Sequence, residues 1–443
     1  MSNPRLETYK ILSKVQLKGI FSDKLIDQLR KKKDLEKKDF NLVFMLLKGI
    51  LKMRSNLDYI ASQYVQGQNF ERTDTKIKLL LNLGFYQLLY CDQIPDHAAI
   101  NETVELAKQI FNRKVAAFIN AVLRSYQKNP RISYPQEKDK YLAYKYSFPV
   151  DLIRRWITLW DADSTESLCE FFNQVPHLSI RINTFATERL KLKDYFARRG
   201  IKTWESEASP NILLSDQSEN VLQDIAFEEG YYSIQDESAA MVVELLKPEP
   251  NESVLDLFGG PGGKAAYISE LMHNSGELIV IDKFPAKIKK IKQNVERLQI
   301  TNMKVINEDA FKYGPVAPSF EKVLLDVPCS GWGVLQKKAE LRWQTHQNMN
   351  ELLKLQANAL KTGARFVKPG GVLLYSTCTM NNKENEQQIE RFLDQHKEFQ
   401  LMDAINCLPQ RYTSNNFLKT IPFLHQMDGA FAAKMKKNNR SSR

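Results

Sequence analysis

The sequence predicts an α/β protein in which a Rossmann-like sheet follows an all-helical region and a small α/β module. Residues 1–127 carry apolar side chains only at helical spacing, whereas strands and helices alternate from Pro248 onward. A glycine-rich turn joins the first of these strands to a helix. Alternation of this kind predicts a mostly parallel sheet with helices on both faces and with ligands at the carboxyl ends of its strands.

The first 130 residues are expected to form an all-helical domain. Asp39 is placed to cap a helix, and the most regular apolar stripe runs from Val115 to Tyr126. Such stripes indicate helix packing rather than a binding site. Prolines 130 and 135 stand among polar residues and mark a linker at 131–144.

A small α/β module is expected at 145–245. Its first segment, 145–160, predicts a single helix with one apolar face, and 177–185 alternates as a strand. Arg181 lies in that strand, where an exposed position is its simplest interpretation.

The sheet domain is expected at 246–443. The predicted strands are 254–258, 278–282, 303–307, 321–327 and 371–376. The predicted helices are 264–272, 285–298, 349–367 and 383–395, the last capped by Asn381 or Asn382.

The stretch LDLFGGPGGK marks a cofactor site. Gly259, Gly260, Gly262 and Gly263 permit positive φ and close approach of a ligand to the backbone. Asp282 follows about twenty residues later, at a strand end, where it can hydrogen-bond a ribose. Because 260–265 also satisfies the dinucleotide pattern, this stretch alone leaves a dinucleotide and S-adenosylmethionine both open.

The charge of the chain favours a polyanionic partner. Lys and Arg number 63 against 52 Asp and Glu, giving a net charge of +11, with basic runs at 30–38 and 434–443. No apolar stretch approaches membrane-spanning length and the amino terminus lacks a signal region. We therefore expect a cytoplasmic protein with a nucleic acid as partner and no membrane.

The five cysteines are widely spaced, and their spacing indicates neither a disulfide framework nor a metal site. Cys91, Cys169 and Cys407 are expected to act as small buried hydrophobes. Cys329 and Cys378 instead follow the ends of two strands of the predicted sheet, beside the proposed cofactor. These two are the candidate reactive thiols.

Four segments resemble the RsmB/Sun family of RNA cytosine-5 methyltransferases: LDLFGGPGGK, DVPCSGWG, YSTCTMNNKENE and DGAFAAKMKK. HAAINETVELAK and KVAAFINAVLR resemble the NusB-like RNA-binding domain. The resemblance implies a class I methyltransferase domain that uses S-adenosylmethionine to make 5-methylcytosine in RNA, most naturally 16S rRNA, and that acts as a monomer without a metal.

The chemistry implied by the resemblance requires a sulfur nucleophile. Carbon 5 of cytosine does not take a methyl group directly, so a thiolate must first add to carbon 6. The resemblance assigns that addition to Cys378 and the later elimination to Cys329. Asp326 would hydrogen-bond ring nitrogen 3 and border the cofactor, and Lys264 would contact the base or the cofactor carboxylate.

The cofactor contacts implied by the resemblance come from three loops. Asp282 would bind the ribose, and Asp309 stands where the family contacts adenine, although Asp309 could instead cap a helix. The methionine portion would be wrapped by Phe258, Gly259, Gly260, Pro261, Gly262, Gly263 and Lys264.

Departures from the family pattern leave the RNA site open. Trp332 and the pair Lys338-Ala339 replace commoner residues beside the target base, whereas Gly259-Gly260 and Ala265 replace alanines and a threonine without removing a backbone donor. The alternatives are the same chemistry on transfer RNA, a non-catalytic RNA-binding assembly factor, and a nicotinamide oxidoreductase. The oxidoreductase leaves both cysteine loops unexplained, and the assembly factor would not need a nucleophile.

Overall fold

The structure is a computed structural model that describes residues 3–32, 34–65, 70–314, 320–344 and 348–439. The chain forms two compact units. The helical unit comprises Met1–Asn173 with Lys338–Thr345, and the sheet unit comprises Gln174–Lys337 with His346–Arg443. No helix in the described parts of the chain is long and apolar enough to cross a membrane.

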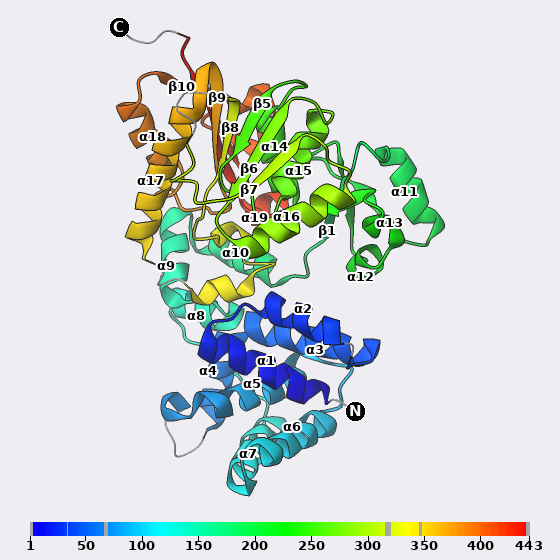
Figure 1. The fold of residues 1–443 in the computed structure, drawn as a ribbon. Coiled ribbons are helices and arrows are strands. Elements are labelled where there is room, and N and C mark those ends of the chain that lie inside the picture. The colour runs from blue at the N-terminus through cyan, green and yellow to red at the C-terminus, as the bar shows by residue number, and fades with distance from the viewer. Residues whose placement is uncertain (1–2, 33, 66–69, 315–319, 345–347, 440–443) are drawn as a thin grey trace. The chain divides into compact units, whose positions relative to one another are not determined.

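The helical unit confirms the prediction of an all-helical amino-terminal region (Figure 1). The helix that begins at Arg113 illustrates how the sequence determines a helix start. The Asn112 side chain caps it by accepting hydrogen bonds from the Lys114 and Val115 N–H groups. The helices are α1 Pro4–Lys18, α2 Ser22–Lys32, α3 Lys37–Lys52, α4 Arg54–Tyr64, α5 Thr75–Tyr90, α6 Asp96–Ile110, α7 Arg113–Lys128, α8 Lys138–Tyr146, α9 Val150–Leu159 and α10 Ala162–Asn173, with 3-10 turns η1 Phe70–Arg72 and η3 Ala339–Trp343.

The single helix predicted at 145–160 is wrong. Helix α8 ends at Tyr146 because Ser147 adopts a left-handed conformation with φ of 63°. Helix α9 starts at Val150, after Pro149, a residue that cannot continue a preceding helix. Helices α8 to α10 belong to the helical unit. The two compact units therefore divide at a different place from the predicted boundaries at 131–144 and 245. The four-part division stays a prediction about sequence modules.

The sheet unit begins with the small module. Its four antiparallel strands lie in the order β2-β3-β1-β4. The strands are β1 Leu178–Ile182, β2 Trp204–Glu205, β3 Ile212–Ser215 and β4 Tyr232–Ile234, accompanied by helices α11 Arg189–Arg198, α12 Ser218–Leu222 and α13 Ile225–Glu228. Arg181 of β1 is not exposed as interpreted from the sequence but fully buried, where it pairs with Glu270.

The main sheet has the order β11-β12-β13-β9-β8-β5-β6-β7, and β10 pairs with β13. The strands from β9 to β7 are parallel and confirm the five predicted strands, whereas β13 is antiparallel to β9. Strands β10 to β13 were not predicted. The strands are β5 Ser253–Asp256, β6 Glu277–Asp282, β7 Met303–Asn307, β8 Phe320–Asp326, β9 Val367–Thr377, β10 Phe399–Leu401, β11 Thr413–Ser414, β12 Phe417–Lys419 and β13 Phe431–Lys437.

Helices cover both faces of this sheet, as the alternation predicts (Figure 1). Val254 faces the core formed with α14, α15 and α16, while its neighbour Leu255 faces the core formed with α17 and α18. Successive strand residues point to opposite faces, so both faces are apolar and both are buried. The helices are α14 Glu237–Leu246, α15 Gly263–Leu271, α16 Pro285–Arg297, α17 Met349–Phe366, α18 Glu386–Gln395 and the short α19 Pro422–His425, with turns η2 Trp332–Val334, η4 Ala404–Asn406 and η5 Gln410–Tyr412.

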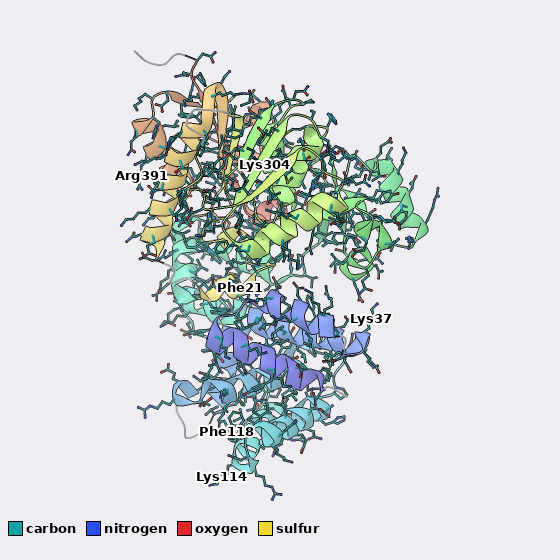
Figure 2. All side chains as sticks on the ribbon, viewed as in Figure 1. Phe21, Lys37, Lys114, Phe118, Lys304 and Arg391 are labelled. Atoms are coloured by element: carbon teal, nitrogen blue, oxygen red, sulfur yellow. The ribbon has the colours of Figure 1, made fainter. Side chains whose placement is uncertain are left out.

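The two basic runs differ in exposure. Lys37 and Lys38 are exposed on the helical unit, and Lys33 of the same run lies outside the described residues (Figure 2). In the carboxyl-terminal run Lys434 is buried within β13, and the Lys437 ammonium donates to the carbonyls of Ala364 and Val367; residues 440–443 lie outside the description. The described lysines of the second run therefore take part in the packing and hydrogen bonding of the sheet, in addition to carrying positive charge.

Candidate functional site

The glycine turn connects β5 to α15 and packs tightly on β6. A Cβ on Gly259 would lie 2.3 Å from Val280 Cγ1, and one on Gly260 would lie 2.5 Å from Asp282 Oδ2. Of the four glycines only Gly262 has a positive φ, of 103°. The positive φ expected of this turn occurs at Gly262, whereas Gly259 and Gly260 are required by the close packing on β6.

Asp282 ends β6 and holds the glycine turn. Its Oδ2 accepts hydrogen bonds from the Gly260 N–H at 3.2 Å and from Lys287 Nζ at 3.1 Å. Its Oδ1 accepts from the Phe284 N–H at 2.9 Å. The carboxylate proposed for the ribose thus lies directly against the cofactor turn.

Asp256, the last residue of β5, is a site residue that the sequence interpretation missed. It is buried, and its Oδ2 has no hydrogen-bond partner among the described residues. Burial raises the pKa of this carboxyl to about 7, and the Asp326 carboxylate adds to the rise. An acid that directly precedes the glycine turn at a strand end was the signal available in the sequence.

Asp309, the residue predicted near adenine, lies just beyond β7. Asp309 Oδ1 accepts the Phe311 N–H at 3.0 Å, a contact of the kind that the capping alternative anticipated. The Phe311 ring lies 6.1 Å from that of Phe258, and Phe284 beyond β6 is half exposed. The exposed rings of Phe284 and Phe311, which follow Asp282 and Asp309 in the chain, provide surfaces on which a purine can stack.

Lys264 and Asp326 form an ion pair at the other side of the turn. Lys264 Nζ lies 2.8 Å from Asp326 Oδ2, and the Ser376 hydroxyl donates to Asp326 Oδ1 at 2.9 Å. Burial has the largest single effect and lowers the pKa of Lys264, but Asp326, Cys378 and Asp256 together more than offset it, so the pKa is raised. Lys264 therefore stays charged and lies close enough to Cys378 to stabilise a thiolate there.

The two candidate thiols meet at the ends of adjacent strands. Strands β8 and β9 are parallel with Asp326 opposite Ser376, so the loops after them leave the sheet side by side. Cys329 Sγ and Cys378 Sγ lie 3.3 Å apart, and the Cys378 N–H points to Cys329 Sγ at 3.3 Å. The hydrogen bond to Cys378 and burial raise the pKa of Cys329 well above its ordinary value. These contacts therefore favour the protonated form of the Cys329 thiol.

The other three cysteines belong to different surroundings. Cys91 and Cys169 are buried, as predicted for small hydrophobes, and Cys407 is half-buried against the core on the α14 face. Of the residues that depart from the family pattern, Trp332 is buried in η2, and Lys338 belongs to the segment Lys338–Thr345 of the helical unit.

The helix after Cys378 starts differently from the prediction. The N-cap position of helix α18 is occupied by Asn385, and not by Asn381 or Asn382. The Asn385 side chain accepts from the Thr377 hydroxyl at 2.7 Å and donates to the Thr379 carbonyl at 2.9 Å. These bonds fix the backbone on both sides of Cys378.

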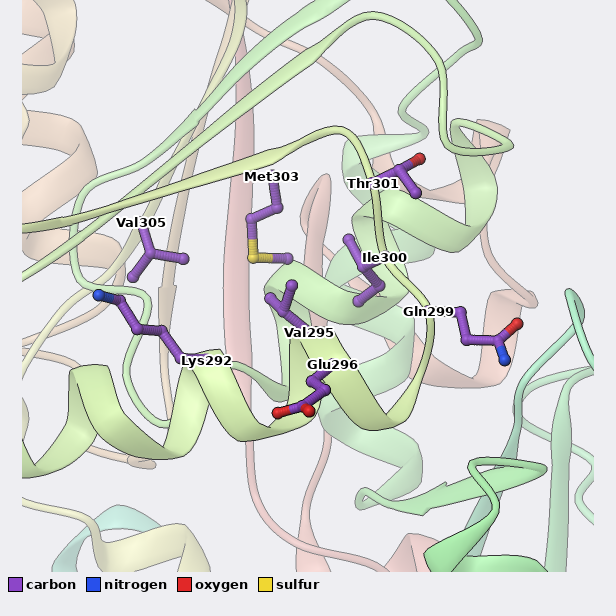
Figure 3. A pocket seen from close by; sticks show the side chains of 8 residues that line it. All are labelled: Lys292, Val295, Glu296, Gln299, Ile300, Thr301, Met303 and Val305. Atoms are coloured by element: carbon purple, nitrogen blue, oxygen red, sulfur yellow. The ribbon is translucent and has the colours of Figure 1, made fainter.

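A shallow hollow of about 380 Å³ lies between α16 and the edge strand β7 (Figure 3). None of the predicted site residues lines it. The lining side chains are Lys292, Val295, Glu296, Gln299, Ile300, Thr301, Met303 and Val305. The hollow is therefore separate from the glycine turn and the thiols.

Comparison with protein families assigns most of the chain. The model of the 16S rRNA methyltransferase RsmB/F family matches residues 243–436, and that of the NusB family matches residues 2–128. A model of the ferredoxin-like domain of RsmF/B-like methyltransferases matches residues 148–221.

Similar proteins match along nearly the whole length. A probable ribosomal RNA small subunit methyltransferase B of Synechocystis is 34% identical, covering 99% of this chain and 100% of the relative. A protein of the same description from Bacillus subtilis is 32% identical, covering 96% and 97%. The crystal structure of PH0851 superposes with a TM-score of 0.83 at 28% identity and covers 99% of this chain and 100% of that one.

Proposed function

Because the chain belongs to the RsmB/F family of ribosomal RNA small subunit methyltransferases, we propose that it methylates carbon 5 of a cytosine in 16S rRNA through a covalent cysteine adduct. The observation that carries this proposal is the pair of thiols 3.3 Å apart beside the Lys264–Asp326 ion pair. A methyltransferase that acts on an oxygen or an exocyclic nitrogen has no need of two adjacent thiols.

The first step is addition of sulfur to the base. The Cys378 thiolate attacks carbon 6, and the electron pair of the double bond between carbons 5 and 6 makes carbon 5 nucleophilic. The Lys264 ammonium favours the thiolate before attack. Asp326 accepts a hydrogen bond from protonated ring nitrogen 3, which stabilises the charge that develops on addition.

The second half of the reaction releases the enzyme. After methylation the proton on carbon 5 passes to solvent water, and the electron pair of that carbon–hydrogen bond re-forms the ring double bond. The bond between carbon 6 and Cys378 Sγ breaks, and its electron pair leaves with the sulfur. Cys329 lies at hydrogen-bond distance from the departing sulfur and remains a thiol because its pKa is raised. A donor at that position stabilises the leaving thiolate.

The methyl donor we propose is S-adenosylmethionine, which supplies an electrophilic methyl group. The chain offers suitable partners for it. The orphaned Oδ2 of Asp256 can accept from the methionine ammonium, and the glycine turn leaves no Cβ in the way of the backbone. Asp282 is proposed for the ribose hydroxyls and Asp309 for adenine.

RNA binding is proposed to use the NusB-like region together with the methyltransferase domain. The net charge of +11 favours the phosphate backbone, and exposed lysines such as Lys37 and Lys114 supply positive charge on the helical unit (Figure 2). These contacts position the RNA and carry no information about sequence.

The two thiols give opposite outcomes in a test. Labelled RNA and S-adenosylmethionine are incubated with each variant, and products are separated on a denaturing gel. Cys378→Ala should neither methylate nor form a covalent adduct, whereas Cys329→Ala should accumulate an adduct after methylation. Methylation retained by both variants without any adduct would refute covalent catalysis, and an adduct only in Cys378→Ala would reverse the roles. Bisulfite sequencing of total RNA with and without the gene then identifies the modified cytosine and separates 16S rRNA from transfer RNA.

A further inference from the structure

A buried carboxylate joins the two cysteine loops. Glu384 lies six residues after Cys378 and is completely buried. Within the described residues it forms no ion pair with a lysine, arginine or histidine, and its stabilisation comes from hydrogen bonds. A buried charge without a cationic partner is costly, so such a residue has to be held by several donors.

Four donors converge on the two oxygens of Glu384. Oε2 accepts from the Ser330 N–H at 2.9 Å and from Gln356 Nε2 at 3.0 Å. Oε1 accepts from the Ser330 hydroxyl at 2.5 Å and from Asn381 Nδ2 at 2.9 Å. Ser330 directly follows Cys329, and Asn381 is three residues beyond Cys378, so one carboxylate bridges both loops.

The two loops do not depend on Glu384 equally. Cys378 directly follows β9, and Asn385 fixes the threonines on both sides of it. Cys329 lies three residues beyond β8 in a segment without regular structure. Its following residue, Ser330, gives two hydrogen bonds to Glu384, and Gln356 ties Glu384 to the Pro328 carbonyl at 3.0 Å. Loss of the carboxylate should therefore displace Cys329 more than Cys378.

We propose that Glu384 is a positioning residue that sets Cys329 against Cys378, so that it governs release of the methylated base rather than formation of the adduct. This inference rests on the proposed covalent mechanism. It assigns Glu384 no contact with RNA or cofactor. The negative charge of Glu384 also raises the pKa of Cys329, as the Cys378 sulfur does, and so favours the protonated thiol.

The test compares Glu384→Gln with the matched variant Glu386→Gln. Glutamine keeps the size of the side chain but offers one acceptor oxygen where the carboxylate offers two. Glu386 is two residues further on and pairs with Lys419 at 2.7 Å, outside both cysteine loops. For each protein, one measures S-adenosylmethionine affinity, the rate of methylation in a single turnover, the rate in multiple turnovers, and the adduct on a denaturing gel.

Glu384→Gln should slow multiple turnovers on the order of tenfold, the effect of one lost charge-assisted hydrogen bond, with single-turnover methylation and cofactor affinity little changed. The adduct should persist as in Cys329→Ala, while Glu386→Gln should match the parent protein. A purely structural role would lower both rates by the same factor without a persistent adduct, and that result would overturn the inference.

Two further variants keep the outcomes distinct. If Glu384→Gln does not fold, Ser330→Ala removes one donor from the same carboxylate and should give a smaller effect of the same kind; unchanged release there would overturn the inference. Cys329→Ala serves as the reference for the mechanism. If Cys329→Ala accumulates an adduct and Glu384→Gln does not, only the role of Glu384 fails, whereas absence of an adduct from Cys329→Ala refutes the proposed function itself.

Discussion

Asp256→Asn should make the protein more stable and a poorer binder of its cofactor. The carboxyl is buried with one orphaned oxygen, and its pKa is raised from 3.8 to about 7. At a pH between those two pKa values, Asp256 is protonated in the folded protein but has lost its proton in the unfolded chain. Stability therefore falls as pH rises through this range, and an amide that never ionises escapes the loss.

The size of the effect follows from the pKa shift. A rise from 3.8 to about 7 corresponds to on the order of 4 kcal/mol, at about 1.4 kcal/mol for each pKa unit. The advantage of asparagine should be about 2 kcal/mol at pH 5 and should reach its full value above about pH 7. Loss of the carboxylate should at the same time weaken S-adenosylmethionine binding by about 10- to 100-fold, because a charge-assisted hydrogen bond is lost.

Hydrogen exchange measures the stability of the relevant strands. Since the chain has two compact units, a single melting curve does not report on one transition, whereas amide exchange of β5 and β8 peptides isolates the sheet unit. Equilibrium binding of labelled S-adenosylmethionine gives the affinity. Asp394→Asn is the control, because that side chain is 81% exposed and the substitution should change neither quantity.

Two outcomes would refute this reasoning. Equal stability of Asp256→Asn and the parent protein at pH 8 would show that the carboxyl is not strained by burial. A gain in stability that is the same at pH 5 and pH 8 would show that it arises from packing and not from ionisation. Unchanged cofactor affinity would remove Asp256 from the cofactor site while leaving the stability argument intact.

Two further predictions concern RNA binding and the helical unit. The logarithm of the RNA association constant should fall linearly with the logarithm of salt concentration in fluorescence anisotropy titrations, because neutralised phosphates release counterions; affinity that is indifferent to salt would contradict this. Arg342→Met should destabilise the helical unit by on the order of 1–3 kcal/mol in hydrogen exchange of α3 and α10, because it removes the donor shared by the carbonyls of Lys52, Ser147 and Phe172 and the side chain of Asn173. Arg113→Met, at an exposed position, should have little effect, and equal exchange in the two variants would show that the Arg342 bonds contribute nothing.

The strand ends were predictable because their signals are local. A buried parallel strand reads as a short apolar run, and the residue after it must emerge at the carboxyl edge of the sheet. Asp282, Asp326 and the two cysteines could therefore be assigned to one edge before any contact was known. Strands β10, β11 and β12 escaped prediction because they have only two or three residues, too few for a periodic pattern. Strand β13 has seven residues, but its three lysines made it part of a basic run in the sequence.

The supporting residues could not be predicted because their roles depend on contacts distant in the sequence. Arg181 alternates with apolar neighbours like any exposed strand residue, yet it is buried against Glu270 and lies over the Tyr267 ring, 89 and 86 positions away. Glu384 likewise lies in a polar stretch typical of a loop. Burial of a charge is decided by partners that only the tertiary fold brings together.

The predicted linker at 131–144 shows how the same limitation affects domain boundaries. Prolines and polar residues mark a break in the helical pattern, which predicts a linker. In the helical unit, however, the Tyr59 ring of α4 stacks on Tyr134 at 5.8 Å and on Tyr144 at 4.4 Å, and the Asn56 amide donates to the Tyr134 hydroxyl and the Tyr144 carbonyl. Stacked rings and part-buried hydrogen bonds therefore tie this segment to α4, and the linker at 131–144 stays a prediction. Removing only residues 1–127 would strip these partners from the segment, so Gln174, where the sheet unit begins, is the better-founded place to divide the chain.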